Sequence, residues 1–311
     1  NAEQIRFSKF LATIRTDVPV ELDLEKLRVT EPDTAELRRL FTELEFKTLL
    51  DKFLNNRENI KNNANGQLDL FSEIPADGQV GEEKSALKTL TDTPHTYKLV
   101  DTEEDMLKLR DFFMTKSFLS LDTETTSTNT IDAELVGLSF SVSENEAFYV
   151  PVPADRQQAQ NIVNIFKPVY EQTSILKIGQ NIKYDMEVLA NYGVELAGEM
   201  FDTMLAHYLL QPEQRHNMDD MAETYLGYRT IHIDELIGPK GKGQKSMRDL
   251  PPEEVYEYAA EDADVTLKLK NLLEPKLKEA GVWQLFSEVE MPLVRVLASM
   301  ERNGVRLDTD S

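Results

Sequence analysis

The sequence contains no cysteine and only four histidines among its 311 residues. Without cysteine the chain can form no disulfide bridge and no thiolate metal site, so a metal ion could be held only by oxygen ligands or by histidine. The chain also lacks a run of about 18 apolar residues that could span a bilayer, and its first residues show no signal-peptide pattern. These absences predict a cytoplasmic protein with no membrane segment.

Basic residues are scarce beside acidic ones. The chain has 34 Lys and Arg against 56 Asp and Glu, which gives a net charge of −22. Nonspecific affinity for nucleic acid comes from cations that neutralise phosphates, so this balance argues against a broad phosphate-binding surface. An acidic protein can still act on a few nucleotides if divalent cations reverse the local field.

The composition divides the chain into four regions. Residues 1–54 favour helices and turns, with apolar core candidates at Leu27, Leu37, Leu40, Phe41, Leu44 and Phe46. Residues 55–95 are rich in Asn, Gly, Asp, Glu, Thr and Pro without sustained periodicity, which predicts a flexible acidic linker. Residues 96–280 alternate strand and helix patterns, and residues 281–311 contain an amphipathic helix at 283–303.

Residues 96–280 have the pattern of a mixed α/β domain. Apolar β-type runs at 117–123, 135–142 and 147–152 are spaced as an antiparallel meander would be. A crossover helix and a further strand follow, at 157–171 and 175–178. More helices are expected at 103–115, 184–192, 202–210, 218–226 and 253–272. The pattern predicts a mixed sheet covered by helices.

Two acidic residues stand two positions apart at the end of the first of these strands. Side chains alternate along a strand, so Asp122 and Glu124 point to the same side. Like charges on one face repel, and a hard divalent cation with oxygen ligands would offset the repulsion. The alternative is an exposed strand end with no ligand.

Two further acidic residues lie at helices. Asn181 can cap the helix that follows the strand at 175–178, and Asp185 in its first turns would lie near the positive end of the helix dipole. Tyr258 and Asp262 are four residues apart on one helix, hence neighbours on one face. A phenol there could orient water beside a metal-binding carboxylate. Helix capping and a tyrosine packed on a solvated acidic helix are the alternatives.

Together these elements resemble a known family. Asp122-Thr123-Glu124, Asn181 to Asp185 and Tyr258 to Asp262 are similar, in order and spacing, to the three motifs of the DEDD exonucleases with tyrosine in the third motif. Three further segments resemble the proofreading domain of the bacterial family A DNA polymerases, DNA polymerase I: Val136–Phe140, Phe201–Leu205 and Tyr258–Thr266. The resemblance implies an RNase H-like exonuclease fold, with a mixed sheet of about five strands covered by helices and short helical flanks.

The resemblance also implies a mechanism. Two Mg²⁺ or Mn²⁺ ions would be held by Asp122, Glu124, Asp185 and Asp262, with a water molecule oriented by Tyr258. Two such ions suit in-line hydrolysis of a phosphodiester without a covalent intermediate. The expected activity is removal of nucleoside 5′-monophosphates from DNA 3′ ends, in proofreading.

Contacts to the DNA strand are expected at several positions. By resemblance, Gln180, Asn181 and Tyr184 lie along a single-stranded or frayed 3′ end, with capping and packing as the alternative role. Arg215 would contact a phosphate. The loop at 240–248 is positive and contains glycines, so Lys242 and Lys245 would approach phosphates, unless the loop is merely solvated.

Two positions depart from the family pattern. Thr128 and Ile233 stand where the polymerases commonly place a Leu and a Phe against the terminal bases. Because aromatic platforms contribute about 1–3 kcal/mol per base, weaker stacking is expected. His207, on an otherwise apolar helix, is expected to be a core or partly exposed histidine rather than a metal ligand.

The flanks carry resemblances of their own. Residues 1–54 resemble the C-terminal end of a 5′-nuclease domain, and residues 281–311 resemble the opening of a polymerase domain. The chain begins at Asn1 and ends at Ser311 soon after a helical stretch, which indicates a fragment of a longer protein that should not itself synthesise DNA. Two alternatives remain open: a stand-alone DEDD ribonuclease, and a catalytically silent spacer or binding domain.

One apolar island interrupts the predicted linker. Gln67, Leu68, Leu70 and Phe71 belong to a pentapeptide that resembles the segment by which bacterial polymerases dock on the sliding clamp. A compact apolar anchor in a flexible segment can fill a pocket on a partner. The expected partners are therefore a DNA 3′ end and, through residues 67–71, the sliding clamp. The chain itself is expected to be a monomer.

Overall fold

The computed structural model describes residues 2–14, 33–44, 46, 87–238 and 244–307, which belong to two compact units, 1–83 and 84–311. The predicted clamp-binding residues Gln67, Leu68, Leu70 and Phe71 lie outside the described residues, as does Leu27.

The described part of the first unit consists of helices α1 (Ala2–Ala12) and α2 (Thr34–Glu43). The prediction of core positions at Leu44 and Phe46 was wrong, because these side chains are 54% and 46% exposed. Two short helices bury too little area to enclose them. Leu37, Leu40 and Phe41 are partly buried.

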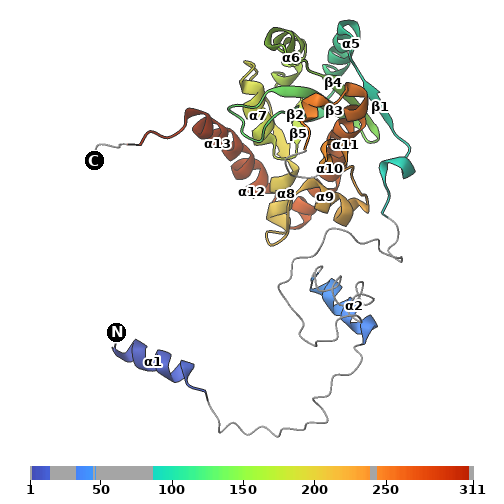
Figure 1. Ribbon diagram of the computed structural model, residues 1–311. Helices are drawn as coiled ribbons and strands as arrows, with labels where there is room; N and C mark the ends of the chain where they lie inside the picture. The colour runs from blue at the N-terminus through green and yellow to red at the C-terminus, as the bar shows by residue number, and fades with distance from the viewer. Residues whose placement is uncertain (1, 15–32, 45, 47–86, 239–243, 308–311) are drawn as a thin grey trace. The chain divides into compact units, whose positions relative to one another are not determined.

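The second unit is built on a six-stranded mixed sheet (Figure 1). Its spatial order is β1-β4-β3-β2-β5-β6, with antiparallel pairs β2/β3 and β3/β4 and parallel pairs β1/β4, β2/β5 and β5/β6. The bounds are β1 (Thr96–Leu99), β2 (Phe118–Thr125), β3 (Leu135–Ser143), β4 (Glu146–Pro151), β5 (Leu176–Gly179) and β6 (Met200–Asp202). The meander and the crossover strand were predicted. The two edge strands were missed, because four and three residues are too few to show an alternating pattern.

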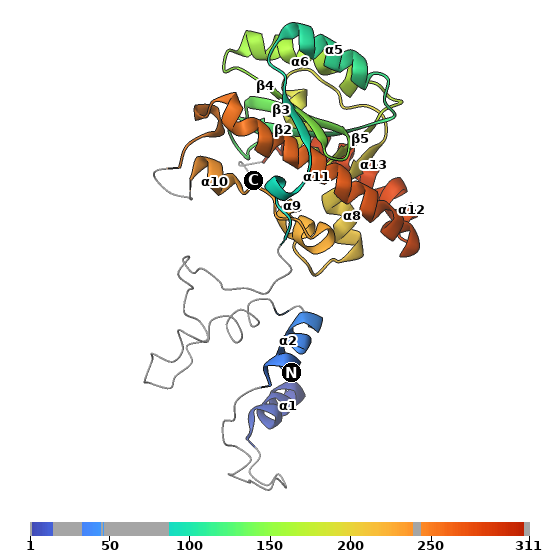
Figure 2. The same ribbon diagram turned by 90° about the vertical axis from the view of Figure 1, so that its right-hand side faces the viewer.

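Helices cover both faces of the sheet. Figure 2 shows α5 (Glu103–Phe113) and α6 (Arg156–Tyr170) on one side and α11 (Pro252–Glu279) on the other. The first side holds an aromatic core in which the Phe140 ring lies 5.1 Å from the rings of both Phe113 and Phe166. Leu119 and Leu121 of β2 belong to this core, so the intervening side chains of β2 face α11.

Small side chains let α11 lie against the sheet. Ala259, Ala260 and Ala263 are completely buried. The predicted end of this helix at 272 was too early: α11 continues to Glu279, since Leu273 and Leu277 extend its buried stripe.

The remaining helices connect and flank the sheet. They are α7 (Ile182–Ala190), α8 (Thr203–Leu210), α9 (Met218–Met221), α10 (Ile233–Ile237), α12 (Trp283–Leu285) and α13 (Met291–Asn303), with π-helical turns at Ala222–Leu226 and Phe286–Glu290 and 3-10 turns at Leu90–Asp92 and Met247–Asp249. None of the helices in the described ranges is long and apolar enough to cross a membrane.

The folded unit starts before residue 95, where the predicted linker was to end. Lys88 forms a parallel bridge with Tyr228, and Leu90 is buried. The composition did not predict that this segment packs on the unit, because Leu90 alone is too short an apolar pattern to recognise.

Candidate active site

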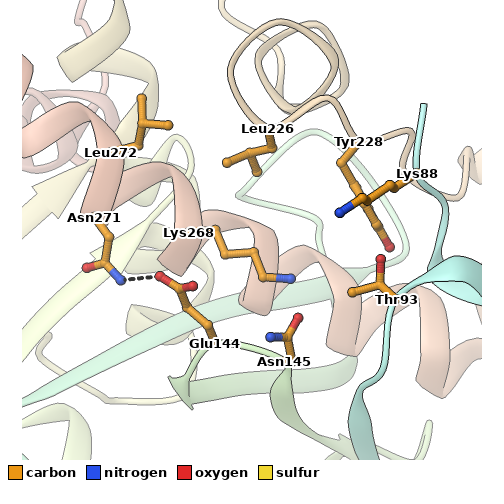
Figure 3. Close-up of a pocket in the computed structure, with 9 residues that line it drawn as sticks. All are labelled: Lys88, Thr93, Glu144, Asn145, Leu226, Tyr228, Lys268, Asn271 and Leu272. Carbon is orange, nitrogen blue, oxygen red and sulfur yellow. Dashed lines mark hydrogen bonds between the residues drawn. The ribbon is translucent and has the colours of Figure 1, made fainter. Parts of the chain in front are cut away.

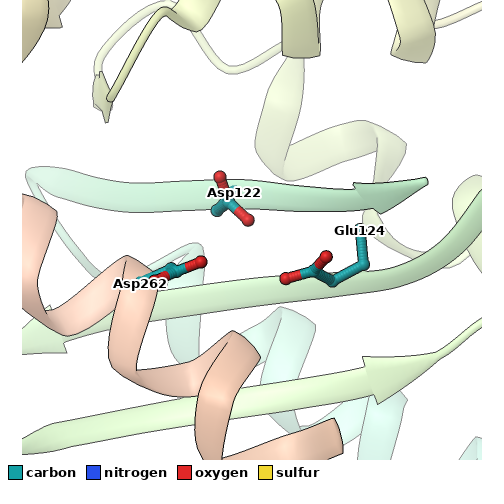
Figure 4. Close-up of side chains that lie close together, drawn as sticks. All are labelled: Asp122, Glu124 and Asp262. Atoms are coloured by element: carbon teal, nitrogen blue, oxygen red, sulfur yellow. The ribbon is translucent and has the colours of Figure 1, made fainter. Parts of the chain in front are cut away.

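Three carboxylates from two elements meet on one face of the sheet. Asp122 and Glu124 project from β2 toward α11, and Asp262 projects from α11 toward them (Figure 4). One carboxylate oxygen of each lies within 4.8 Å of the others. We refer to Asp122, Glu124 and Asp262 as the carboxylate cluster. The alternation predicted for β2 puts Asp122 and Glu124 on one face, and the packing of α11 against β2 brings Asp262 to them.

The neighbouring strand leaves room beside Glu124. In the β2/β3 register, Gly137 stands opposite Glu124. A Cβ atom at Gly137 would lie 2.1 Å from the ring of Tyr149, so only glycine allows that ring to pack there. Burial raises the pKa of Tyr149, and the charge of Glu124 adds to the effect. The ring of Tyr149 thus occupies the space at Gly137, opposite Glu124.

The cluster carries excess negative charge in a poorly solvated place. Burial raises the pKa of Asp122 to about 6. Burial first, and the charge of Asp122 second, raise the pKa of Glu124 and of Asp262 well above their usual ranges. Within the described residues, Oε1 of Glu124 is buried without a hydrogen-bond partner. Buried carboxylate oxygens that lack donors fit a hard divalent cation.

Asp185 lies beside the cluster but outside the group of three. It is buried at the start of α7, and its Oδ1 accepts a hydrogen bond of 2.7 Å from the hydroxyl of Thr123. Burial raises the pKa of Asp185 well above its usual range, and the charge of Asp122 is the second cause. Asp185 and Asp122 therefore interact electrostatically, although Asp185 was predicted to share one site with all three.

Tyr258 is partly buried one helical turn before Asp262. The charge of Asp262 is the largest cause that raises the pKa of Tyr258, and burial is the second. The phenol therefore keeps its proton and can act as a hydrogen-bond donor.

Asp202, at the end of β6, positions the helix that carries Asp185. Its buried carboxylate accepts hydrogen bonds from the backbone N–H of Asn181 and Ile182 and from those of Met204 and Leu205. It therefore caps α7 as well as its own helix, α8. The capping expected of the Asn181 side chain is wrong: Asn181 has φ 58° and makes no side-chain cap. An Asp before a helix predicts only the cap of that helix, here α8. The cap of α7 could not be predicted, since it joins residues about twenty positions apart.

Comparison with known proteins shows which family the segment with the carboxylate cluster belongs to. Residues 97–278 match the family described as 3′-5′ exonuclease. The chain belongs to this family. The match contains β2, α7 and α11, the elements that carry the four carboxylates.

The exonuclease is similar to DNA polymerase I of Pseudomonas aeruginosa, with 36% identity over 100% of this chain and 33% of that protein. The chain therefore spans about a third of this relative's length. In fold it is similar to Brucella melitensis NrnC with bound Mg²⁺ (20% identity, TM-score 0.51, 70% of this chain and 99% of that one). It is also similar to Escherichia coli RNase D, an exoribonuclease involved in structured RNA processing (20% identity, TM-score 0.51, 68% of this chain and 52% of that one). The expected RNase H-like exonuclease fold is confirmed.

Two residues that the sequence assigned to the DNA strand bond within the exonuclease itself. Gln180 donates to the backbone oxygen of His216 at 2.8 Å and accepts from the hydroxyl of Thr203. The hydroxyl of Tyr184 bonds to that of Thr125, beside Glu124. Contact of Gln180 and Tyr184 with a DNA strand stays a prediction.

The other predicted strand contacts have free side chains or lie outside the described residues. Arg215 and Lys245 are exposed, and neither forms an ion pair with another described residue of the exonuclease. Lys242 lies outside the described residues. Thr128 and Ile233 are exposed, as wedge positions should be, although neither is large and aromatic.

His207 is a buried histidine, as expected. Its Nδ1 lies 2.8 Å from Nδ1 of His216, and burial lowers its pKa. It does not belong to the group of three possible metal ligands found among the described residues.

Figure 3 shows the lining residues of a cavity of about 510 Å³. Lys88, Lys268 and Tyr228 are among its lining residues, and Asn271 bonds to Glu144 in its wall. Lys268 is paired with the buried Asp264 at 2.8 Å. No residue of the carboxylate cluster lines this cavity.

Proposed function

We propose that the chain is a metal-dependent exonuclease that removes nucleotides from DNA 3′ ends as nucleoside 5′-monophosphates. The observation that carries this proposal is the carboxylate cluster, where Asp262 of α11 meets Asp122 and Glu124 of β2 inside an exonuclease-family domain. The proposed cofactors are two Mg²⁺ or Mn²⁺ ions, because hard cations prefer carboxylate oxygens.

The four carboxylates would bind the two cations as two sets of ligands. Asp122, Glu124 and Asp262 would hold one ion, and Asp185, whose pKa is raised by the charge of Asp122, would help to hold a second. The buried Glu124 oxygen without a donor supports this proposal. Activation of the attacking water and stabilisation of the departing 3′ oxygen are the chemistry that two such ions supply when bound.

Tyr258 would serve as a donor rather than as a base. The charge of Asp262 keeps its phenol protonated, so the hydroxyl can hold the attacking water or a phosphate oxygen in line. The proton that the water releases must then leave by another route than Tyr258.

Few cations are available to hold the substrate. Asn181, Arg215 and Lys245 have side chains free for a strand, and Lys242 is proposed with them. With a net charge of −22, the protein should hold a short single-stranded or frayed 3′ end rather than a duplex.

Proofreading within a DNA polymerase I is the proposed context, because the whole chain is similar to such an enzyme. Residues 1–54 would then be the end of a 5′-nuclease domain and residues 281–311 the start of a polymerase domain. The cytoplasmic, nucleoid-associated location and the monomeric state of the chain stay predictions. So does docking on the sliding clamp through residues 67–71.

The likeness to RNase D favours a second candidate, a 3′–5′ ribonuclease. Matched single-stranded DNA and RNA oligonucleotides, labelled at the 5′ end and incubated with the chain and Mg²⁺ or EDTA, distinguish the two. We expect Mg²⁺-dependent shortening of DNA at least about tenfold faster than of RNA. Faster loss of RNA would support the ribonuclease, and a folded protein that shortens neither would be a silent spacer.

A further inference from the structure

The last helix of the chain is bonded to the helix that carries Asp185. α13 lies beyond the matched residues 97–278, yet it runs beside α7 (Figure 1). Nη1 of Arg302 donates to the backbone oxygen of Glu187 at 2.9 Å and to Oδ1 of Asn191 at 3.0 Å. One guanidinium nitrogen thus joins two acceptors at the end of α7.

Glu187 and Asn191 both form hydrogen bonds with Thr130. Nδ2 of Asn191 donates to the backbone oxygen of Thr130 at 2.7 Å, and the Thr130 hydroxyl donates to Oε2 of Glu187 at 2.6 Å. The carbonyl and the hydroxyl of Thr130 are therefore both held by the residues that Arg302 contacts. Glu187 is only 2% exposed and its bond with Thr130 is partly buried, so little water is available to replace that bond.

Thr130 belongs to the loop 126–134, which begins two residues after Glu124. This loop connects β2 to β3, and it presents Thr128 and the 73% exposed Ile131 to solvent. Because the loop follows directly on the strand that carries Asp122 and Glu124, a shift of the loop would change the surface beside the proposed site, where a strand end would be held.

α13 is itself firmly attached to the unit. Met291, Val294 and Ala298 are buried, and Arg295 donates to the backbone oxygens of Leu196 and Gly198. Its end can therefore act as a fixed support rather than as a mobile tail.

We propose that Arg302 is a positioning residue of the exonuclease site. Through Glu187 and Asn191 it sets the position of Thr130, and thus of the loop 126–134 beside Glu124. The inference rests on the proposed function for its consequence in catalysis, but its structural part can be measured without activity. It places the functional boundary of the exonuclease after residue 302 rather than at 280.

The test compares Arg302→Ala with Arg306→Ala in the full chain. Arg306 is exposed and has no hydrogen bond or ion pair with another described residue, so it is a matched control. We expect faster amide hydrogen exchange in residues 126–134 of Arg302→Ala alone. We also expect the KM for a single-stranded DNA oligonucleotide to rise about three- to tenfold with little change in kcat, and Arg302→Lys to restore part of it.

A double-mutant cycle with Asn191→Ala examines the path. The two substitutions should raise KM by less than the product of their separate effects, because each breaks the same chain of bonds. Unchanged exchange in 126–134, fully independent effects on KM, or a loss of kcat that follows the unfolded fraction would each overturn the proposal. If the wild-type chain shortened no DNA, the proposed function would fail, while the exchange comparison would still decide the role of Arg302.

Discussion

Thr123 donates a hydrogen bond of 2.7 Å to Asp185, although it stands between two residues of the carboxylate cluster. Its side chain points to the opposite face of β2 from those of Asp122 and Glu124. The strand therefore contributes to the site from both faces, with two carboxylates toward α11 and one hydroxyl toward α7.

Replacement of Thr123 by valine should disturb Asp185 without disturbing the cluster. A buried carboxylate that loses a donor is destabilised by about 1–3 kcal/mol. We expect exonuclease activity to fall about tenfold and the Mg²⁺ concentration for half-maximal rate to rise, with the fold retained. Thr173→Val is the control, since Thr173 is exposed. Equal Mg²⁺ dependence in Thr123→Val and wild type would contradict a role of Asp185 in metal binding.

The raised carboxylate pKa values predict how stability depends on pH. Burial raises the pKa of Asp122 to about 6, and those of Glu124, Asp185 and Asp262 lie well above their usual ranges. From about pH 4 upward, the folded state then binds more protons than the unfolded chain at these groups. The contribution of Asp122 to the free energy of unfolding is therefore present at low pH and is lost as pH rises through about 6. The contributions of the other three carboxylates are lost in the same direction, as pH rises through their own raised pKa values.

Urea unfolding in EDTA and in Mg²⁺, at pH 5 and pH 8, measures this effect. Because cations compete with protons for the same oxygens, Mg²⁺ should stabilise the protein more at pH 8 than at pH 5. Asp122→Asn should reduce that difference, and the exposed Asp111→Asn should not. Equal stabilisation by Mg²⁺ at both values of pH would be inconsistent with a cation in the cluster.

Tyr258→Phe should slow hydrolysis without changing the shape of its pH profile. The phenol stays protonated because Asp262 raises its pKa, so its removal deletes a donor and no titrating base. We expect kcat to fall about 10- to 100-fold, with Tyr256→Phe on the same helix as the control. A pH–rate limb that disappears in Tyr258→Phe would mean that Tyr258 acts as a base.

Asp202→Ala should be the most destabilising of the capping substitutions. Asp202 accepts four backbone hydrogen bonds at two helix ends, whereas Asp155 accepts one, from Gln158. Removing a cap costs about 1 kcal/mol, so we expect about 2–4 kcal/mol for Asp202→Ala and about 1 kcal/mol for Asp155→Ala. Urea titration of the two variants measures the difference, and equal losses would show that the shared cap on α7 contributes little.

The sequence predicts those parts of the site that depend on local periodicity. Asp122 and Glu124 share a face because a strand alternates, and Tyr258 and Asp262 share one because a helix turns every 3.6 residues. The same rules give the meander and the longer helices of residues 97–280, but not the short helix α10 or the end of α11.

Relations between distant residues could not be predicted in this way. The bond from Thr123 to Asp185 and the cap of α7 by Asp202 depend on how β2, β5 and β6 are placed side by side. The contact of Arg302 with α7 joins residues more than a hundred positions apart. No local pattern carries such information.

Release of mononucleotides by the wild-type chain and by Asp262→Asn is the most direct test of the carboxylate cluster. Single-stranded DNA labelled at its 3′ end should give labelled nucleoside 5′-monophosphate as the first product in Mg²⁺, and none in EDTA. Asp262→Asn should lower the rate by at least about a hundredfold while keeping the fold, and the control Asp111→Asn should match wild type. Near wild-type release by Asp262→Asn in Mg²⁺ would contradict the account.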